Sequence, residues 1–248
     1  MFIKKPYLKK HSQIAGFTAW LVNGEYVRNK INMEFPNFGQ HYRFGFIPRD
    51  EFWIDHETHP NEAGFYIEHM LVEYRLMALG KDYITAFDRA NTIEKRERNK
   101  SKIMRELTNG KPIKIITAID KIHRYVLYSA GALKVWLVNG EIARDLCLIY
   151  FNSGGHDLVY DFIPENEIWI DDDITPEERK FVIVHELRER NLMKEGWGYY
   201  KNSYYDQHHP SKIHHSAHLS ASIIEHECRD KPEIVDKKIE DELQKICF

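Results

Sequence analysis

The sequence predicts an α+β protein that arose by tandem duplication of a small domain, in which a few β-strands are followed by two helices. Two observations support this fold class. Segments of the first half return in the second half in the same order, and in each copy short apolar runs precede runs with helical spacing. Strands followed by helices are typical of α+β domains.

The duplication is visible as matching segments in a constant register from Trp20 to Gly80. The period is far longer than the roughly 20–50 residues of a solenoid repeat, which indicates a duplicated domain. The turn signal Asn109–Pro112 separates the copies, so we expect an N-terminal copy at 1–108 and a C-terminal copy at 109–248. The clearest matches are Trp20–Glu25 with Trp136–Glu141, Phe46–Pro48 with Phe162–Pro164, Trp53–Asp55 with Trp169–Asp171, His69 with His185, and Glu73 with Glu189.

The β-elements come first in the C-terminal copy. We expect a strand at 136–138 that ends at Asn139-Gly140, because both residues tolerate the positive φ of a tight turn. Gly154–His156 is expected to be a loop. Residues 167–171 alternate between apolar and polar side chains, as a half-buried strand does.

The helices follow, and capping residues mark their ends. Thr175, Pro176 and Glu178 match an N-cap, a first helical position and a capping box. A helix is therefore expected from there to about Lys194, where Gly196 provides a stop signal. A second helix is expected over about 216–229. A terminal amphipathic helix is predicted by helical spacing of Val235, Ile239, Leu243 and Ile246.

Composition excludes several classes of protein. The 35 Lys plus Arg nearly balance 38 Asp plus Glu, so no global field attracts nucleic acid or an anionic membrane. No apolar run approaches the ~20 residues that cross a bilayer, and the first residues lack the apolar core of a signal peptide. The 3 cysteines are odd in number and lack metal-ligand spacing. We therefore expect a cytoplasmic protein with reduced thiols and with neither nucleic-acid nor membrane partners.

The first of the predicted helices carries the motif H-E-x-x-E, which runs from His185 to Glu189. These two residues are four apart, so they share a helix face and can bind one metal ion. Glu186 lies about 100° around the helix, where it can hold and deprotonate a metal-bound water molecule. The following helix offers His218 and Glu225 on one face as further ligands. Zinc accepts both imidazole nitrogen and carboxylate oxygen.

This pattern resembles that of zincin metallopeptidases, specifically the gluzincins, which combine H-E-x-x-H on one helix with a Glu from a following helix. The resemblance implies a zinc cofactor and a peptide or protein substrate. It also implies that Ile168–Asp171 is an edge strand that aligns the substrate, and that His185, Glu186 and Glu225 act as ligand, base and ligand. Glu189 stands where the second histidine of the family would be, and His218 can replace that imidazole.

His156 is a second candidate catalytic residue, because it follows a glycine turn that can place it near developing negative charge. The alternative is a turn histidine that faces solvent.

The N-terminal copy provides an internal comparison. It keeps His69, Glu73 and a later glutamate, Glu94. In it, Met70 replaces Glu186 and Phe87 replaces His218. One interpretation is an active C-terminal copy paired within the chain with a degenerate N-terminal copy. The other is that the shared His and Glu residues form a structural polar network, paired with a buried arginine such as Arg75 or Arg190.

The sequence therefore supports two functions. The first is a metal-dependent zinc hydrolase, foremost a zincin-like peptidase, in which Glu186 activates water on an ion held by His185, Glu189 or His218, and Glu225. The second is a non-catalytic structural or interaction protein. Hydrolysis of a non-peptide substrate is a third interpretation, because zinc-water chemistry serves amides, esters and phosphoesters alike.

Overall fold

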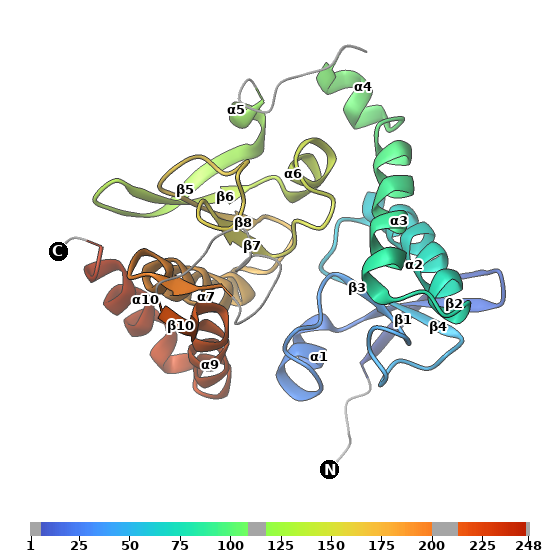
Figure 1. Cartoon of the computed structure of the whole chain (residues 1–248), viewed down its shortest axis with the longest axis horizontal. Coiled ribbons are helices and arrows are strands. Elements are labelled where there is room, and N and C mark those ends of the chain that lie inside the picture. Colours follow the sequence, from blue (N-terminus) through green and yellow to red (C-terminus); the bar gives the residue numbers. More distant parts are fainter. Residues whose placement is uncertain (1–5, 109–117, 200–212, 247–248) are drawn as a thin grey trace. The chain divides into compact units, whose positions relative to one another are not determined.

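The computed structural model describes residues 6–108, 118–199 and 213–246. They form an α+β protein in which one architecture, a mixed four-stranded sheet followed by helices, occurs twice (Figure 1). The predicted fold class, with its internal duplication, is confirmed. The chain divides into two compact units, Met1–Ala118 with Glu141–Tyr150, and Ile119–Gly140 with Phe151–Phe248. The expected boundary between the copies, at 108/109, borders on residues 109–117, which lie outside the described part of the chain.

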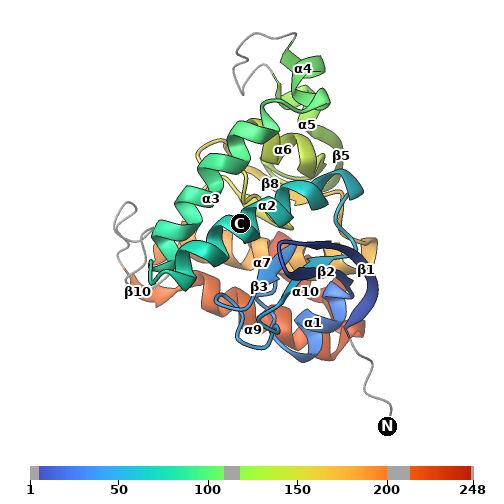
Figure 2. The ribbon, with the colours of Figure 1, turned by 90° about the vertical axis from the view of Figure 1, so that its right-hand side faces the viewer.

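The sheet of the first unit has the strand order β1-β2-β4-β3. Its strands are β1 (Tyr7–Ile14), β2 (Phe17–Val22), β3 (Phe38–Gln40) and β4 (Glu51–Asp55). The central pair, β2 and β4, is parallel, whereas β1 and β3 pair antiparallel at the edges. The helical elements are α1 (Gly24–Lys30), η1 (Pro60–Glu62), α2 (Ala63–Ala78), α3 (Tyr83–Arg98) and α4 (Lys102–Thr108). Helix α2 shares an apolar core with β2 and β4, and α3 packs beside α2 (Figure 2).

The second unit repeats this order as β5-β6-β8-β7. Its strands are β5 (His123–Ala130), β6 (Leu133–Val138), β7 (Gly154–His156) and β8 (Glu167–Asp171). The other elements are α5 (Ile119–Ile122), α7 (Pro176–Lys194), β9 (Trp197–Gly198), β10 (Ile213–Ser216), α9 (Ala217–Asp230), η3 (Pro232–Ile234) and α10 (Val235–Gln244). One apolar core joins the sheet to α7 and α10. Helix α6 (Gly140–Leu146) starts in this unit, but from Glu141 onward its residues belong to the first unit.

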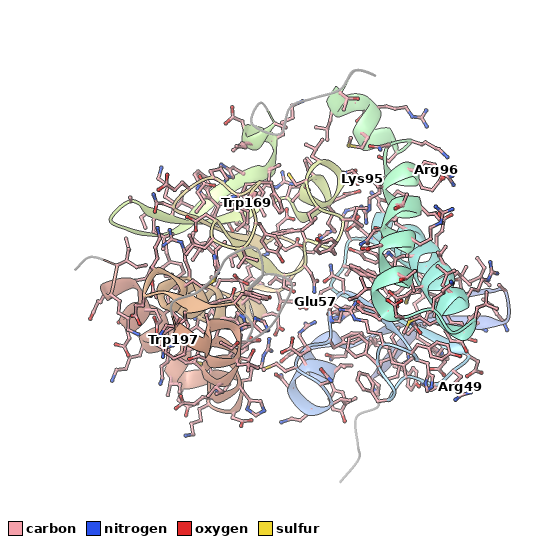
Figure 3. All side chains as sticks on the ribbon, in the orientation of Figure 1. Arg49, Glu57, Lys95, Arg96, Trp169 and Trp197 are labelled. Carbon is pink, nitrogen blue, oxygen red and sulfur yellow. The ribbon has the colours of Figure 1, made fainter. Side chains whose placement is uncertain are left out.

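The two sheets also agree in register. Trp20 lies opposite Trp53 between β2 and β4, and Trp136 lies opposite Trp169 between β6 and β8. Trp169 is fully buried in the second unit, where Figure 3 labels it. The repeated tryptophans therefore belong to two equivalent parallel strand pairs.

The predicted helices of the C-terminal copy are confirmed. Helix α7 starts after Thr175, whose side chain accepts a hydrogen bond from the backbone N–H of Glu178 at 3.3 Å. Gly196 follows the helix with a φ of 99°, as a stop signal requires. Helices α9 and α10 occupy the two later segments with helical spacing. Among the described residues, no helix is both long and apolar enough to span a bilayer.

The Asn-Gly dipeptides start helices, so the prediction of a tight turn is wrong. The Asn23 side chain caps α1 by accepting a hydrogen bond from the Tyr26 N–H at 2.7 Å, and α6 likewise begins at Gly140. Glycine is required because a Cβ at Gly24 would overlap the carboxylate of Asp55 at the end of the neighbouring strand. The dipeptide thus marks a helix start that packs closely against a strand end.

The edge of the second sheet also differs from expectation. Strand β8 lies between β6 and β7, so the expectation that Ile168–Asp171 is an edge strand is wrong. The edge strands are β5 and β7, and the sequence predicts a loop where β7 lies. This segment pairs antiparallel with β8, and its residue His156 contacts Glu189 of α7.

Candidate metal centre

Helix α7 carries the three residues of the motif and presents them to two different neighbours. His185 and Glu189 are buried where α7 packs against α9. Glu186 lies against β7, where a Cβ added to Gly154 would be 3.3 Å from its Oε1 and 2.7 Å from a methyl of Val182. Because residue 154 is glycine, α7 can approach the β7 backbone this closely.

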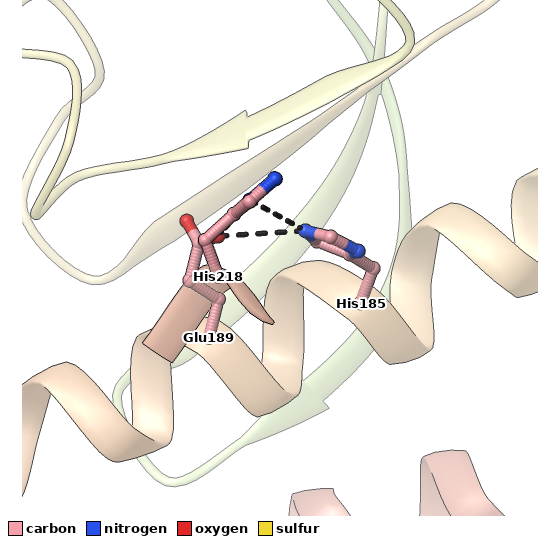
Figure 4. A group of neighbouring side chains, drawn as sticks. All are labelled: His185, Glu189 and His218. Carbon is pink, nitrogen blue, oxygen red and sulfur yellow. Dashed lines mark hydrogen bonds and ion pairs between the residues drawn. The ribbon is translucent and has the colours of Figure 1, made fainter. Parts of the chain in front are cut away.

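Three donor atoms from α7 and α9 face one another (Figure 4). His185 Nε2 lies 3.2 Å from His218 Nδ1 and 3.4 Å from Glu189 Oε2. His218 Nδ1 lies 2.8 Å from the same Glu189 oxygen. The structure therefore brings together three of the four predicted metal ligands.

The spacing and chemistry of these atoms fit a zinc ion. Ligands about 2.0–2.1 Å from zinc in a tetrahedron are about 3.3 Å from one another. The three separations measured here, 2.8, 3.2 and 3.4 Å, surround that value. Two imidazole nitrogens and one carboxylate oxygen are also a donor set that zinc accepts. His185, Glu189 and His218 are therefore suited to hold a divalent ion.

Glu225, the fourth predicted ligand, lies on the other side of the His185 ring. Its Oε2 accepts a hydrogen bond from His185 Nδ1 at 2.7 Å, and its Oε1 accepts one from Arg229 Nε at 2.9 Å. Both oxygens are thus engaged away from the group formed by His185, Glu189 and His218. The arrangement is that of a carboxylate that orients a histidine ligand.

His156 is fully buried, so the alternative of a solvent-facing turn residue is wrong. Its Nδ1 accepts a hydrogen bond from the backbone N–H of Leu158 at 3.2 Å, which leaves the proton on Nε2. That Nε2–H donates to Glu189 Oε1 at 3.0 Å. His156, Glu186 and Glu189 also lie close enough to form a second candidate metal group. The protonated Nε2 makes this group less suitable for a metal and instead holds the Glu189 carboxylate in place.

The electrostatics separate the two glutamates of the motif. Burial, reinforced by the charge of Glu189, raises the pKa of Glu186 to about 7. Burial would also raise the pKa of Glu189, but hydrogen bonds from His156, His185 and His218 hold that pKa well below its usual range. One carboxyl is thus poised to exchange a proton near neutral pH, while the other stays charged.

The environment of His185 favours the charged form of its ring. Burial alone would lower its pKa, but hydrogen bonds to Glu189 and Glu225 raise the pKa well above the ordinary value. In the metal-free protein the ring therefore donates from both nitrogens. A metal ion at Nε2 would take the place of the proton on that nitrogen.

The N-terminal copy contains the same framework with different chemistry. His69 Nδ1 lies 2.8 Å from Glu94, and its Nε2 lies 3.4 Å from Glu73, as in the C-terminal copy. Around this pair the rings of Phe38 and Phe87 pack edge-on against His69. Residues near this pair that differ between the copies include Phe38 and Gly154, Gln40 and His156, Met70 and Glu186, and Phe87 and His218.

Sequence reasoning missed the arginine that pairs with these carboxylates. Arg75 is exposed, and Arg190 pairs with Asp157 at 2.6 Å, so neither serves the proposed network. Arg229 does so, by binding Glu225 and Glu178. The signal was present in the sequence, because Arg98 follows Glu94 at the same spacing.

Comparison of the chain with protein-family models, curated proteins and solved structures found no match. The zincin likeness therefore stands on the sequence pattern alone.

Proposed function

We propose that the C-terminal copy is a zinc-dependent hydrolase that acts on a peptide or protein. His185, Glu189 and His218 would hold the ion, and Glu186 would act as the general base. His156 and Glu225 would be positioning residues for Glu189 and His185. A cytoplasmic location is part of this proposal, and the free thiols of Cys147 and Cys228 support it.

One observation carries this proposal. Three polar residues that the C-terminal copy has and the N-terminal copy lacks, His156, Glu186 and His218, lie around a single carboxylate, Glu189. His156 binds one oxygen of Glu189, His218 binds the other, and Glu186 lies close to both Glu189 and His156. A purely structural network needs none of these three residues, because the N-terminal copy is built without them.

The pKa and the position of Glu186 suit this side chain to proton transfer. A carboxyl group with a pKa of about 7 can accept a proton at neutral pH and return it in a later step. Glu186 lies next to the buried Glu189 and is itself partly exposed to solvent, so a water molecule can reach it. A zinc ion held by the three ligands would supply Lewis acidity, polarising a carbonyl and lowering the pKa of water.

Metal content tests this proposal. Protein incubated with Zn²⁺ and freed of excess metal should retain about one ion per chain by elemental analysis. His185→Ala should remove the zinc, whereas His69→Ala, the same change in the N-terminal copy, should leave it in place. Less than about a tenth of an equivalent in the unsubstituted protein would contradict the proposal.

Turnover of fluorogenic peptide mixtures gives the second readout. Glu186→Gln keeps the shape of the side chain but cannot accept a proton, so it should retain zinc and lose activity by about 10²-fold or more. Equal rates for the two proteins would remove Glu186 from the mechanism.

A structural role is the second candidate, and the shared His–Glu–Arg framework of both copies favours it. On that view, His185→Ala lowers the melting temperature of a protein that never held zinc. The same metal measurement therefore separates the two functions.

A further inference from the structure

We propose that Glu178, Arg229 and Glu225 form a positioning chain that fixes His185 Nε2 as the metal-binding atom. This inference rests on the proposed function and assigns roles that the sequence pattern did not give to these residues.

The chain begins with a two-point ion pair inside the second unit. Arg229 donates from Nη2 to Glu178 Oε1 at 2.7 Å and from Nη1 to Glu178 Oε2 at 2.9 Å. Its guanidinium also lies over the ring of Phe181, 4.8 Å from the ring centre. A planar cation held by a bidentate carboxylate and an aromatic face has little freedom to rotate.

Arg229 then fixes Glu225. The Nε and Nη2 atoms of Arg229 both reach Glu225 Oε1, at 2.9 and 2.8 Å. This leaves Oε2 to face His185 Nδ1 at 2.7 Å. The side chains of Glu178 and Arg229 are 2% and 3% exposed, so solvent offers no competing partner.

The last step concerns the imidazole. An ionised carboxylate can only accept hydrogen bonds, so His185 Nδ1 must carry a proton. In the neutral ring the lone pair is then on Nε2, the atom directed at Glu189 and His218. The chain therefore selects the ligand atom and fixes the orientation of the ring.

The N-terminal copy contains the same chain without the other site residues. Arg98 binds Glu62 and Glu94, and Glu94 binds His69 Nδ1. Arg98 also lies over a ring, that of Phe65, at 4.6 Å. This second chain allows the contribution of such a chain to helix packing to be measured apart from any effect on metal binding.

The test compares Glu225→Gln with its counterpart Glu94→Gln in the full-length protein. Both changes should lower the melting temperature, because each weakens a buried ion pair. Only Glu225→Gln should weaken Zn²⁺ affinity, by about 10–100-fold. The visible absorption of bound Co²⁺ should keep its shape and intensity in Glu225→Gln, because the ligand atoms are unchanged.

Each other outcome has a definite meaning. Unchanged Zn²⁺ affinity in Glu225→Gln would show that Glu178, Arg229 and Glu225 only stabilise helix packing. An altered Co²⁺ spectrum would indicate that Glu225 is itself a metal ligand. Either result would overturn the inference. Absence of zinc from the unsubstituted protein would instead contradict the proposed function. If Glu225→Gln does not fold, Arg229→Lys is compared with Arg98→Lys, since lysine keeps the charge but loses the two-point contact.

Discussion

The environment of Glu186 disfavours the negatively charged form of its carboxyl group. It is partly buried, and the neighbouring carboxylate of Glu189 remains ionised. In the N-terminal copy the same helix position is Met70, which is fully buried in an apolar core. The C-terminal copy thus keeps a titratable carboxyl group at a position where its own duplicate uses a hydrophobic side chain, which is typical of functional sites.

This environment makes stability depend on pH in the metal-free protein. The pKa of Glu186 is about 7 in the folded state and near 4.5 when unperturbed. Between these values the folded state binds more protons than the unfolded state, so the free energy of unfolding falls as pH rises. Glu186→Gln removes this cost. Chemical denaturation with zinc chelated should show the variant gaining about 1–3 kcal/mol over the unsubstituted protein above pH 7, and little below pH 4.5. A gain of equal size at both pH values would contradict the assignment.

At this scale the sequence identifies side chains better than it identifies their partners. Helical spacing placed His185 and Glu189 on one face, and that is where they lie. The same spacing could not show that Glu225 turns its oxygens toward His185 Nδ1 and Arg229. That choice depends on the ion pair between Arg229 and Glu178, which are 51 residues apart. Which atom of a polar side chain is engaged depends on tertiary packing.

The start of α9 determines the position of His218. Ser216 caps this helix, because its hydroxyl accepts a hydrogen bond from the Leu219 N–H at 3.0 Å and donates one to the Tyr199 carbonyl at 2.8 Å. His218 lies in the first turn, and its ring packs against that of Tyr199. A frayed first turn would displace one of the three ligands.

Ser216→Ala should therefore affect both stability and metal binding. Loss of an N-cap costs about 0.5–2 kcal/mol. Zn²⁺ affinity, measured by competition with a chelating dye, should fall about tenfold or more. Asp82→Ala removes the N-cap of α3 in the first unit, where Asp82 accepts from the Thr85 N–H at 2.9 Å. It should cost similar stability with no change in zinc affinity, and equal losses of affinity in both variants would contradict the prediction.

Helices were predicted more accurately than the other elements, because residues at their own ends signal where they begin and stop. Thr175 and Gly196 signal helix ends through their own backbone preferences. The Asn-Gly dipeptides do not signal a single structure, because Asn-Gly is compatible with both a tight turn and a helix start. The deciding contact is with Asp55 or Asp171, which lies far along the chain. The edge position of β7 depends in the same way on which strand it pairs with.

At the scale of the whole molecule, the duplication shows which residues the fold can exchange. Gln40 donates to Glu73 at 2.5 Å, as His156 does to Glu189, and Met70 and Phe87 occupy the places of Glu186 and His218. The His–Glu–Arg framework beside these positions occurs in both copies. Side chains taken from the N-terminal copy should therefore fit the C-terminal one.

The combined variant His156→Gln, Glu186→Met and His218→Phe tests this. It should fold with a melting temperature within about 6 °C of the unsubstituted protein, since it introduces the side chains that the N-terminal copy uses at three of the four differing positions. It should retain less than about a tenth of an equivalent of zinc by elemental analysis. Full zinc retention would show that these residues are not what separates the two copies.

The sequence predicted the repetition but not how the chain is divided into units. Equivalent segments can be matched by identity alone, so the two similar sheets followed from the residues. Nothing in the matching segments showed that Glu141–Tyr150 belongs to the unit built by the other copy. Within that unit, this segment forms ion pairs with residues distant in sequence, such as Arg144 with Glu62 and Asp145 with Arg98.

Glu62, the buried carboxylate before α2, accepts hydrogen bonds from both Arg98 and Arg144, and Arg98 also reaches Asp145 at 3.0 Å. A gene truncated after codon 108 would encode a protein without Arg144 and Asp145. Its Glu62 would lose one of two cationic partners, and that loss would be destabilising. The N-terminal half therefore draws part of its buried charge pairing from residues that lie beyond the junction between the copies.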